Sequence, residues 1–191
     1  MLRFDAFVLP LAAAAAVLSI QQPARADTAL VAAAGATAFA SMWRGDYAAG
    51  GTLRGGARFS RVVQIDFQVW ESLATVNERA DTGLSLGVTG FLPLRGVRPY
   101  ARLFAIHQHE EGLVSVAAAP AGSLFGIGSG IRHRAGGGLS LGAEVPLPSG
   151  HTRPGVSLFA EATTIYFPDP TLGPSAYFGL DLGLSFDLVL R

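Results

Sequence analysis

Apolar residues alternate one by one with small or polar residues along the last part of the chain, residues 177–190. Every second position is large and apolar: Phe178, Leu180, Leu182, Leu184, Phe186 and Leu188. The positions between them hold Tyr177, Gly179, Asp181, Gly183, Ser185 and Asp187. Because successive side chains of a β-strand point to opposite faces, this pattern predicts a strand with one apolar face and one small or acidic face.

Other segments repeat the alternation and predict further strands. Residues 62–72 place Val63, Ile65, Phe67 and Val69 on one face, and residues 82–92 place Leu84, Leu86, Val88 and Leu92 there. Residues 47–59 alternate with less bulk. A first strand over residues 29–42, which are mostly Ala and Gly, is expected because a closed barrel needs a partner for residues 47–59.

Residues 1–26 have the features of a secretory signal peptide. Arg3 precedes an apolar stretch over residues 6–20, and Ala24-Arg25-Ala26 supplies the small residues that signal peptidase requires. The apolar stretch is shorter than the roughly 20 residues that span a bilayer as a helix. We therefore expect cleavage near Ala26 and a single domain over residues 27–191.

The distribution of hydrophobic residues separates two kinds of barrel. Half of the residues are hydrophobic and only 15% are charged, yet no run after residue 26 is long enough for a membrane helix. Alternating strands behind a signal peptide predict an all-β, closed antiparallel up-and-down transmembrane β-barrel, with lipid outside and a polar lumen. A soluble barrel of the lipocalin type would reverse the pattern, with apolar side chains inside.

Two similar hairpins constrain the number of strands. A Leu-Ser-Leu-Gly sequence precedes a Pro-containing turn at residues 93–99 and again at residues 146–154, so both turns should lie on the periplasmic side. Residues 123–133 alternate as a strand does, and parity then requires another crossing over residues 112–119. We therefore predict ten strands. The alternative is eight strands, with residues 110–138 as a long third extracellular loop, and a structureless loop of that length is uncommon.

The signal peptide, the alternating segments and these two turns resemble the small outer-membrane β-barrel proteins of Gram-negative bacteria. The resemblance covers nearly all of the mature chain and is architectural, since adhesion-related barrels, membrane-to-wall tethers and lipid A modifying enzymes share it. It implies an outer-membrane location, contact with outer-membrane lipid and lipopolysaccharide, and insertion by the barrel assembly machinery. Members usually end in an aromatic residue that this machinery recognises, whereas this chain ends Val189-Leu190-Arg191.

Composition narrows the possible chemistry. The formal net charge is zero, which argues against a nucleic-acid partner. Cysteine is absent, so the chain has neither disulfides nor thiolate chemistry. All 14 basic residues are Arg, whose planar guanidinium suits bidentate pairing with lumenal carboxylates. No cofactor is expected.

Charged residues of both signs fall on the predicted lumenal faces. They are Arg54, Arg58, Asp66, Arg132, Glu144, Glu161 and Asp181. Because buried charges need partners, we interpret this set as a network of ion pairs and hydrogen bonds that fills a narrow interior. A proton or ion path, or a gated pore, is the alternative.

The most chemically capable cluster is His107-Gln108-His109-Glu110-Glu111. Histidines two positions apart share a strand face, so His107 and His109 could bind a metal, with Glu110 or Glu111 as a further ligand. Alternatively, one histidine could serve as the base for Ser115, with a glutamate orienting it, as in some outer-membrane lipid hydrolases. We favour a simpler interpretation, polar residues at the membrane boundary, and predict no catalysis.

Two further features concern the membrane rim. Arg132 and Arg134 flank His133 and form a basic patch suited to lipopolysaccharide phosphates. Six aromatic residues, Trp43, Tyr47, Trp70, Tyr100, Tyr166 and Phe167, fall near predicted strand ends, where an interfacial girdle is expected. The leading interpretation is an integral barrel with a structural, adhesive or loop-mediated binding role. The alternatives are a lipid-active hydrolase or metal-binding barrel that uses His107, His109 and Glu110, and a narrow pore.

Overall fold

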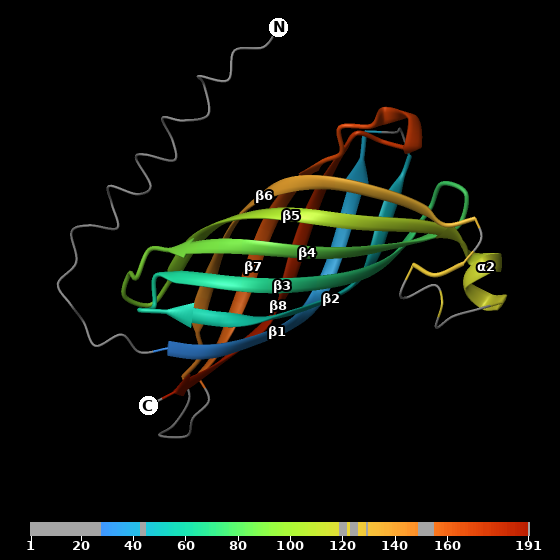
Figure 1. The fold of residues 1–191 in the computed structure, drawn as a ribbon. Helices are drawn as coiled ribbons and strands as arrows, with labels where there is room; N and C mark the ends of the chain where they lie inside the picture. Colours follow the sequence, from blue (N-terminus) through green and yellow to red (C-terminus); the bar gives the residue numbers. More distant parts are fainter. Residues whose placement is uncertain are drawn as a thin grey trace, which may run out of the picture.

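The chain closes into a single barrel. The computed structural model describes residues 28–42, 45–118, 122, 126–128, 130–148 and 155–190. The predicted signal peptide, Trp43 and Arg191 lie outside the described residues. The described residues form eight antiparallel strands, in which each strand pairs with the next and β1 pairs with β8 (Figure 1).

The strands are long enough to cross a bilayer when tilted. They are β1 (Thr28–Ser41), β2 (Tyr47–Phe59), β3 (Val63–Ala74), β4 (Arg79–Phe91), β5 (Arg98–Gly112), β6 (Arg132–Pro146), β7 (Gly155–Tyr166) and β8 (Ala176–Leu190). Helix α2 (Leu113–Ala118) follows β5, and the 3-10 helix η2 (Pro170–Leu172) lies between β7 and β8. No helix among the described residues is both long and apolar enough to cross a membrane.

The two ends of the barrel differ. The terminal end is where β1 begins and β8 ends, and it also holds the connections β2–β3, β4–β5 and β6–β7. The loop end holds the other four connections, including α2 (Figure 1). The turns predicted to share one side both belong to connections at the terminal end, which confirms that prediction, although residues 149–154 lie outside the described residues.

The prediction of ten strands was wrong, and the eight-stranded alternative is correct. The segment predicted to cross at residues 112–119 instead contains helix α2, which agrees with the helix-favouring alanines there. Of the strand predicted over residues 123–133, the described residues before Arg132 are not in a strand, and β6 begins only at Arg132. Gly126 and Gly130 have φ angles of 66° and 86°, which an extended strand does not accommodate.

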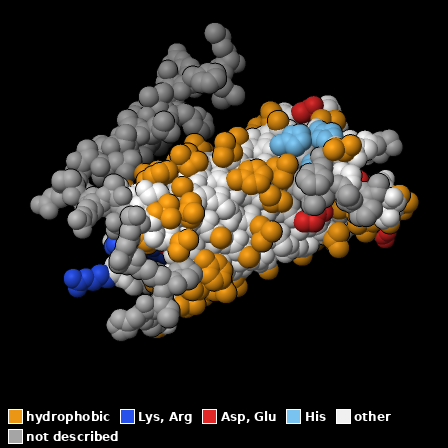
Figure 2. Space-filling model, turned by 60° about the horizontal axis from the view of Figure 1, so that its bottom comes forward, with side chains coloured by type: hydrophobic (Ala, Val, Ile, Leu, Met, Phe, Trp, Pro, Cys, Tyr) orange, Lys and Arg blue, Asp and Glu red, His pale blue; other side chains and the backbone are white. Residues whose placement is uncertain are grey.

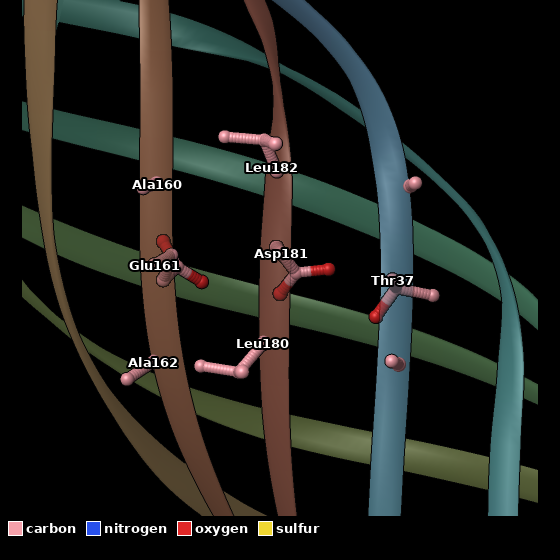
Figure 3. A pocket seen from close by; sticks show the side chains of 9 residues that line it. Thr37, Ala160, Glu161, Ala162, Leu180, Asp181 and Leu182 are labelled. Carbon is pink, nitrogen blue, oxygen red and sulfur yellow. The ribbon is translucent and has the colours of Figure 1, made fainter.

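Side chains alternate between the two faces of the wall as predicted. On β8, Leu180 and Leu182 are 66% and 56% exposed, whereas Asp181 between them is 5% exposed. Figure 3 shows the Asp181 carboxylate between Glu161 and Thr37, with Leu182 above it and Leu180 below it on the same strand. Apolar side chains therefore face outward, and the lipocalin-type alternative is wrong.

The outer surface carries exposed apolar side chains on every strand. Examples taken around the barrel are Leu30, Leu53, Phe67, Leu86, Leu103, Leu141, Leu158 and Leu180. Figure 2 shows hydrophobic side chains spread along the side of the barrel, with charged side chains near its ends. Soluble monomers rarely expose contiguous apolar patches above a few hundred Å². The outer wall is thus suited to contact with hydrocarbon.

The predicted aromatic girdle is only partly present. Tyr47 and Tyr166 are exposed near the loop end, as expected for interfacial anchors. Trp70, Tyr100 and Phe167 are instead buried, at 4%, 5% and 0% exposure. Trp70 and Tyr100 occupy inward positions of their strands. The same alternation that places acidic side chains in the lumen therefore places these two rings there.

Candidate functional site

A network of ion pairs closes the lumen at the terminal end. Arg58 of β2 lies 2.9 Å from the carboxylate of Glu144 on β6 and 2.7 Å from that of Asp187 on β8. Arg98 of β5 joins the same two carboxylates, at 2.8 and 3.2 Å. Arg58 also donates to Gln64 Oε1 and stacks over the ring of Phe91, with its guanidinium carbon 4.2 Å from the ring centroid. The ion pairs alone join four strands, β2, β5, β6 and β8.

A second ionic layer lies nearer the middle of the barrel. Arg54 donates to Glu161 at 2.9 Å and to Gln68 at 3.1 Å. Arg102 Nε donates to Asp66 Oδ1 at 2.7 Å, and both side chains are almost completely buried. Asp66 also accepts hydrogen bonds from Gln64 and Thr89. The buried Arg54 and Arg102 therefore each have a carboxylate of opposite sign, as burial requires.

An aromatic and aliphatic layer occupies the lumen above these ion pairs. It consists chiefly of Phe39, Trp70, Phe104, Ile106, Ile165, Phe167 and Tyr177. The rings of Phe39 and Trp70 lie 5.5 Å apart between centroids, and Phe167 meets Tyr177 edge to face. A cavity of about 10 Å³ remains among Trp70, Tyr177 and their neighbours, roughly the space of one water molecule. Packed aromatic and aliphatic side chains therefore occupy the lumen at this level.

A third ionic layer closes the loop end around Glu110, which is 1% exposed. Glu110 accepts hydrogen bonds from Arg132 at 2.6 Å, from Tyr177 at 3.1 Å and from Arg134. Arg79 Nε lies 3.5 Å from Glu110 and 3.2 Å from Asp81. Arg134 also stacks on the Phe167 ring at 4.2 Å, which links this layer to the aromatic layer.

Asp46, in the connection between β1 and β2, extends the loop-end layer. It accepts two hydrogen bonds from Arg79, at 3.0 and 2.8 Å, and one from Ser41 at 2.7 Å. Burial raises the pKa of this carboxyl, but the hydrogen bonds and charge of Arg79, with the Ser41 hydroxyl, outweigh burial and hold the pKa below its usual range. Asp46 is thus a carboxylate in the folded barrel at neutral pH.

The structure places six of the seven predicted lumenal residues inside the barrel: Arg54, Arg58, Asp66, Glu144, Glu161 and Asp181. Arg132 lies at the loop-end rim with its side chain 40% exposed. Sequence reasoning did not assign Arg79, Arg98, Arg102, Arg134 or Glu110 to the lumen, and it placed Asp187 on the acidic face of its strand without including it in the predicted network; these six residues complete the layers. Arg102 and Asp187 are each an even number of residues away from inward-facing positions on their strands. Counting with a period of two could therefore have placed both side chains in the lumen.

A separate polar cluster lies on the outer wall near the loop end. His107 and His109 share the outer face of β5, and His133 of β6 is the cross-strand partner of His109. His107 Nε2 and His133 Nδ1 are 3.2 Å apart, and one ring nitrogen from each of the three histidines lies within 4.8 Å of the others. Figure 2 shows histidine side chains gathered on the surface near one end of the barrel.

Two other candidate residues, Glu110 and Ser115, lie elsewhere. Glu110 points into the lumen, on the opposite side of the wall from His107 and His109, and is committed to arginines there. Ser115 lies in helix α2. The structure therefore brings His107 and His109 together with His133, which sequence reasoning assigned only to a basic patch, and separates them from Glu110.

These features define a class of protein: an eight-stranded barrel with an apolar exterior and a lumen filled by paired charges has the architecture of a small outer-membrane β-barrel. Comparison with solved structures agrees. Neisserial surface protein A superposes with a TM-score of 0.55 at 14% identity, covering 84% of this chain and 96% of that chain. Outer membrane protein OprG from Pseudomonas aeruginosa gives 0.53 at 10% identity, covering 85% and 97%.

The attachment invasion locus protein Ail of Yersinia pestis, solved with the heparin analogue sucrose octasulfate, gives a TM-score of 0.43 at 11% identity, covering 86% of this chain and 100% of that chain. No family model matches the chain, and no curated protein matches it. The likeness to Neisserial surface protein A and OprG shows that the chain has the fold of small outer-membrane barrels of Gram-negative bacteria, and it is a likeness of fold alone.

Proposed function

We propose that this protein is an integral outer-membrane barrel that conducts no ions and catalyses no reaction, and that holds its loop-end segments at the cell surface for adhesion or binding. The observation that carries the proposal is the combination of an apolar outer wall with a lumen crossed by ion pairs. The outer wall favours insertion into lipid. The lumen gives the barrel rigidity, because its side chains connect strands that are not neighbours in the sheet.

The filled lumen argues against the pore alternative. Arg58 and Glu144 bridge β2 and β6, and Arg54 and Glu161 bridge β2 and β7. The aromatic layer around Trp70 and Tyr177 lies between these pairs and the Glu110 layer. An ion would have to displace several paired charges, each of which is costly to leave buried alone.

The hydrolase alternative has less support than a non-catalytic barrel that presents its loop-end segments. A relay from Ser115 through a histidine to Glu110 requires the three side chains on one face of the wall. Glu110 instead lies in the lumen and is paired with Arg132 and Arg134. The functional surface that remains is the loop end and its rim, where the exposed part of Arg132 is suited to lipopolysaccharide phosphates.

Two measurements test this proposal. The full chain, expressed in a Gram-negative host, is expected in the outer-membrane fraction after insertion by the barrel assembly machinery, and to resist extraction with alkaline carbonate. The purified protein in planar bilayers is expected to show no stepwise current. Recovery as a detergent-free monomer would contradict membrane insertion, and reproducible single-channel steps would contradict the sealed lumen.

The orientation is tested with epitope insertions in two connections. An epitope after Asp169, in the β7–β8 connection at the loop end, should be accessible to antibody on intact cells. An epitope after Arg95, in the β4–β5 connection at the terminal end, should become accessible only after the outer membrane is permeabilised. The reverse result would place the loop end in the periplasm and remove the proposed surface role.

A further inference from the structure

The three histidines of the outer wall form a compact triangle built on regular backbone. His107 and His109 are two residues apart on β5, and His109 is directly opposite His133 on β6. The ring centroids are separated by 6.1 Å for His107 and His109, 5.3 Å for His107 and His133, and 5.9 Å for His109 and His133. A sheet fixes Cα positions more firmly than a loop does, so the triangle is preorganised.

The closest nitrogen–nitrogen distance matches the geometry of a shared metal ion. Two imidazole nitrogens bound to one tetrahedral zinc at about 2.0 to 2.1 Å are about 3.3 Å apart. His107 Nε2 and His133 Nδ1 are 3.2 Å apart. The nitrogen of His109 that completes the set lies within 4.8 Å of both. The three candidate nitrogens thus lie within the span of one small site, and ligation by His109 requires its ring to move toward the other two.

The backbone around Gly126 partly covers this cluster. A Cβ atom on Gly126 would lie 2.9 Å from His109 Nδ1 and 3.0 Å from His133 Cε1. Only glycine allows this close approach, and its φ of 66° also favours glycine. His109 is 2% exposed, whereas His107 and His133 are exposed. The cluster is thus shielded on one side and open on the other, which is the arrangement of a site with an entry path.

We propose that His107, His109 and His133 bind one divalent transition-metal ion, of the class of Zn²⁺, Cu²⁺ or Ni²⁺, at the loop-end rim of the barrel. Neutral imidazoles are ligands for these borderline ions, whereas Ca²⁺ and Mg²⁺ require oxygen ligands. Three protein ligands leave a fourth position for water or an external group. The site lies on the outer wall, so metal binding would tie β5 and β6 together outside the sealed lumen.

The experiment uses purified protein in detergent, without a polyhistidine tag, titrated with Zn²⁺ by isothermal calorimetry. We expect one zinc ion per chain. His107→Ala and His133→Ala should each weaken binding at least about tenfold, since loss of even an outer-shell partner of a metal ligand commonly costs that much. His151→Ala, which changes the one histidine of the sequence outside the triangle, is the matched control and should bind as the parent does.

A second measurement needs no variant and so does not depend on whether a variant folds. Co²⁺ added to the parent protein should give the intense visible absorption of a four-coordinate site, and Zn²⁺ should remove it, while excess Ca²⁺ should not. Absence of this spectrum, or equal loss of zinc binding in His151→Ala, would overturn the proposal. Zinc binding that survives substitution of all three histidines would overturn it as well.

Discussion

Arg58 and Glu144 lie on β2 and β6, on opposite sides of the eight-stranded barrel, yet Arg58 Nη2 is only 2.9 Å from Glu144 Oε1. Both side chains cross the interior to meet. The contact shows that the lumen at this level is no wider than two side chains placed end to end. The same arginine also holds Asp187, so one residue fixes the relative positions of three strands.

Removal of Arg58 should destabilise the barrel strongly. Arg58→Ala leaves Glu144 and Asp187 to share Arg98 alone, and losing one partner of a buried ion pair costs about 3 to 5 kcal/mol. The measurement is the urea midpoint of unfolding in lipid vesicles. Arg95→Ala, which truncates an exposed arginine in the β4–β5 connection, should change the free energy of unfolding by less than about 0.5 kcal/mol. Equal effects of the two substitutions would show that the lumenal pairing contributes little.

Two glycines on the same strand should respond differently to alanine. A Cβ on Gly83 would lie 2.0 Å from the Trp70 ring, whereas one on Gly90 would meet nothing within 4 Å. Gly83→Ala must displace the indole within a packed layer, at a cost of about 1 to 3 kcal/mol. Gly90→Ala should be neutral or slightly stabilising. Trp70 fluorescence should shift in the first variant, and an unchanged urea midpoint and spectrum in Gly83→Ala would contradict the packing described here.

An arginine on the lipid-facing side of β8 should impair insertion. Leu182 is exposed on the outer wall near the middle of its strand, and a charged residue facing the bilayer midplane costs about 2 to 4 kcal/mol. Leu182→Arg should therefore lower the folded fraction in vesicles, measured by heat-modifiable migration on gels. The matched variant Leu94→Arg changes an equally exposed leucine of the β4–β5 connection and should insert normally. If both variants fold as the parent does, the apolar wall does not face hydrocarbon.

Asp46 should make the stability of the loop end depend on pH. Because the folded state lowers the pKa of Asp46, its contribution is complete above the unfolded pKa of about 3.9 and disappears as the pH falls through the lower folded value. Asp46→Asn should thus cost about 2 kcal/mol at pH 7, through weaker hydrogen bonds from Arg79. The difference from the parent should shrink on acidification below about pH 4.

The urea midpoint, measured across this pH range, checks the Asp46 prediction. Glu78→Gln, which neutralises an exposed carboxylate at the same end of the barrel, is the control and should leave the midpoint almost unchanged at pH 7. A gap between Asp46→Asn and the parent that stays constant down to pH 2 would argue that the ion pair with Arg79 has no role in stability.

The alternation of residues was sufficient to predict which face each strand turns to lipid. Residues 177–190 and 62–72 were assigned correctly because a side-chain period of two leaves no freedom once one face is apolar. The strand count failed where Ile127 and Ile131 alternate with glycines, because glycines at positive φ imitate the pattern of a strand without its backbone geometry.

The histidine cluster shows a different limit. His107 and His109 are recognisable from their spacing, but His133 joins them only through the register between β5 and β6. That register is set across the long connection between β5 and β6. The local alternation of residues does not specify which residue of β6 pairs with His109. The lumenal partners of Glu110 come from β4, β6 and β8 for the same reason, and their roles became visible only when the barrel was closed.

The pairing of β1 with β8 runs from Thr28 with Leu190 to Ser41 with Tyr177, so the seam of the barrel joins its first strand to its last. The backbone groups of β1 that face the seam have no partner until β8 is present. A chain that lacks β8 has unpaired backbone groups along the edges of β1 and β7. Hydrocarbon offers these groups no substitute hydrogen bonds. Closure of the barrel therefore requires β8, the last of its eight strands along the chain.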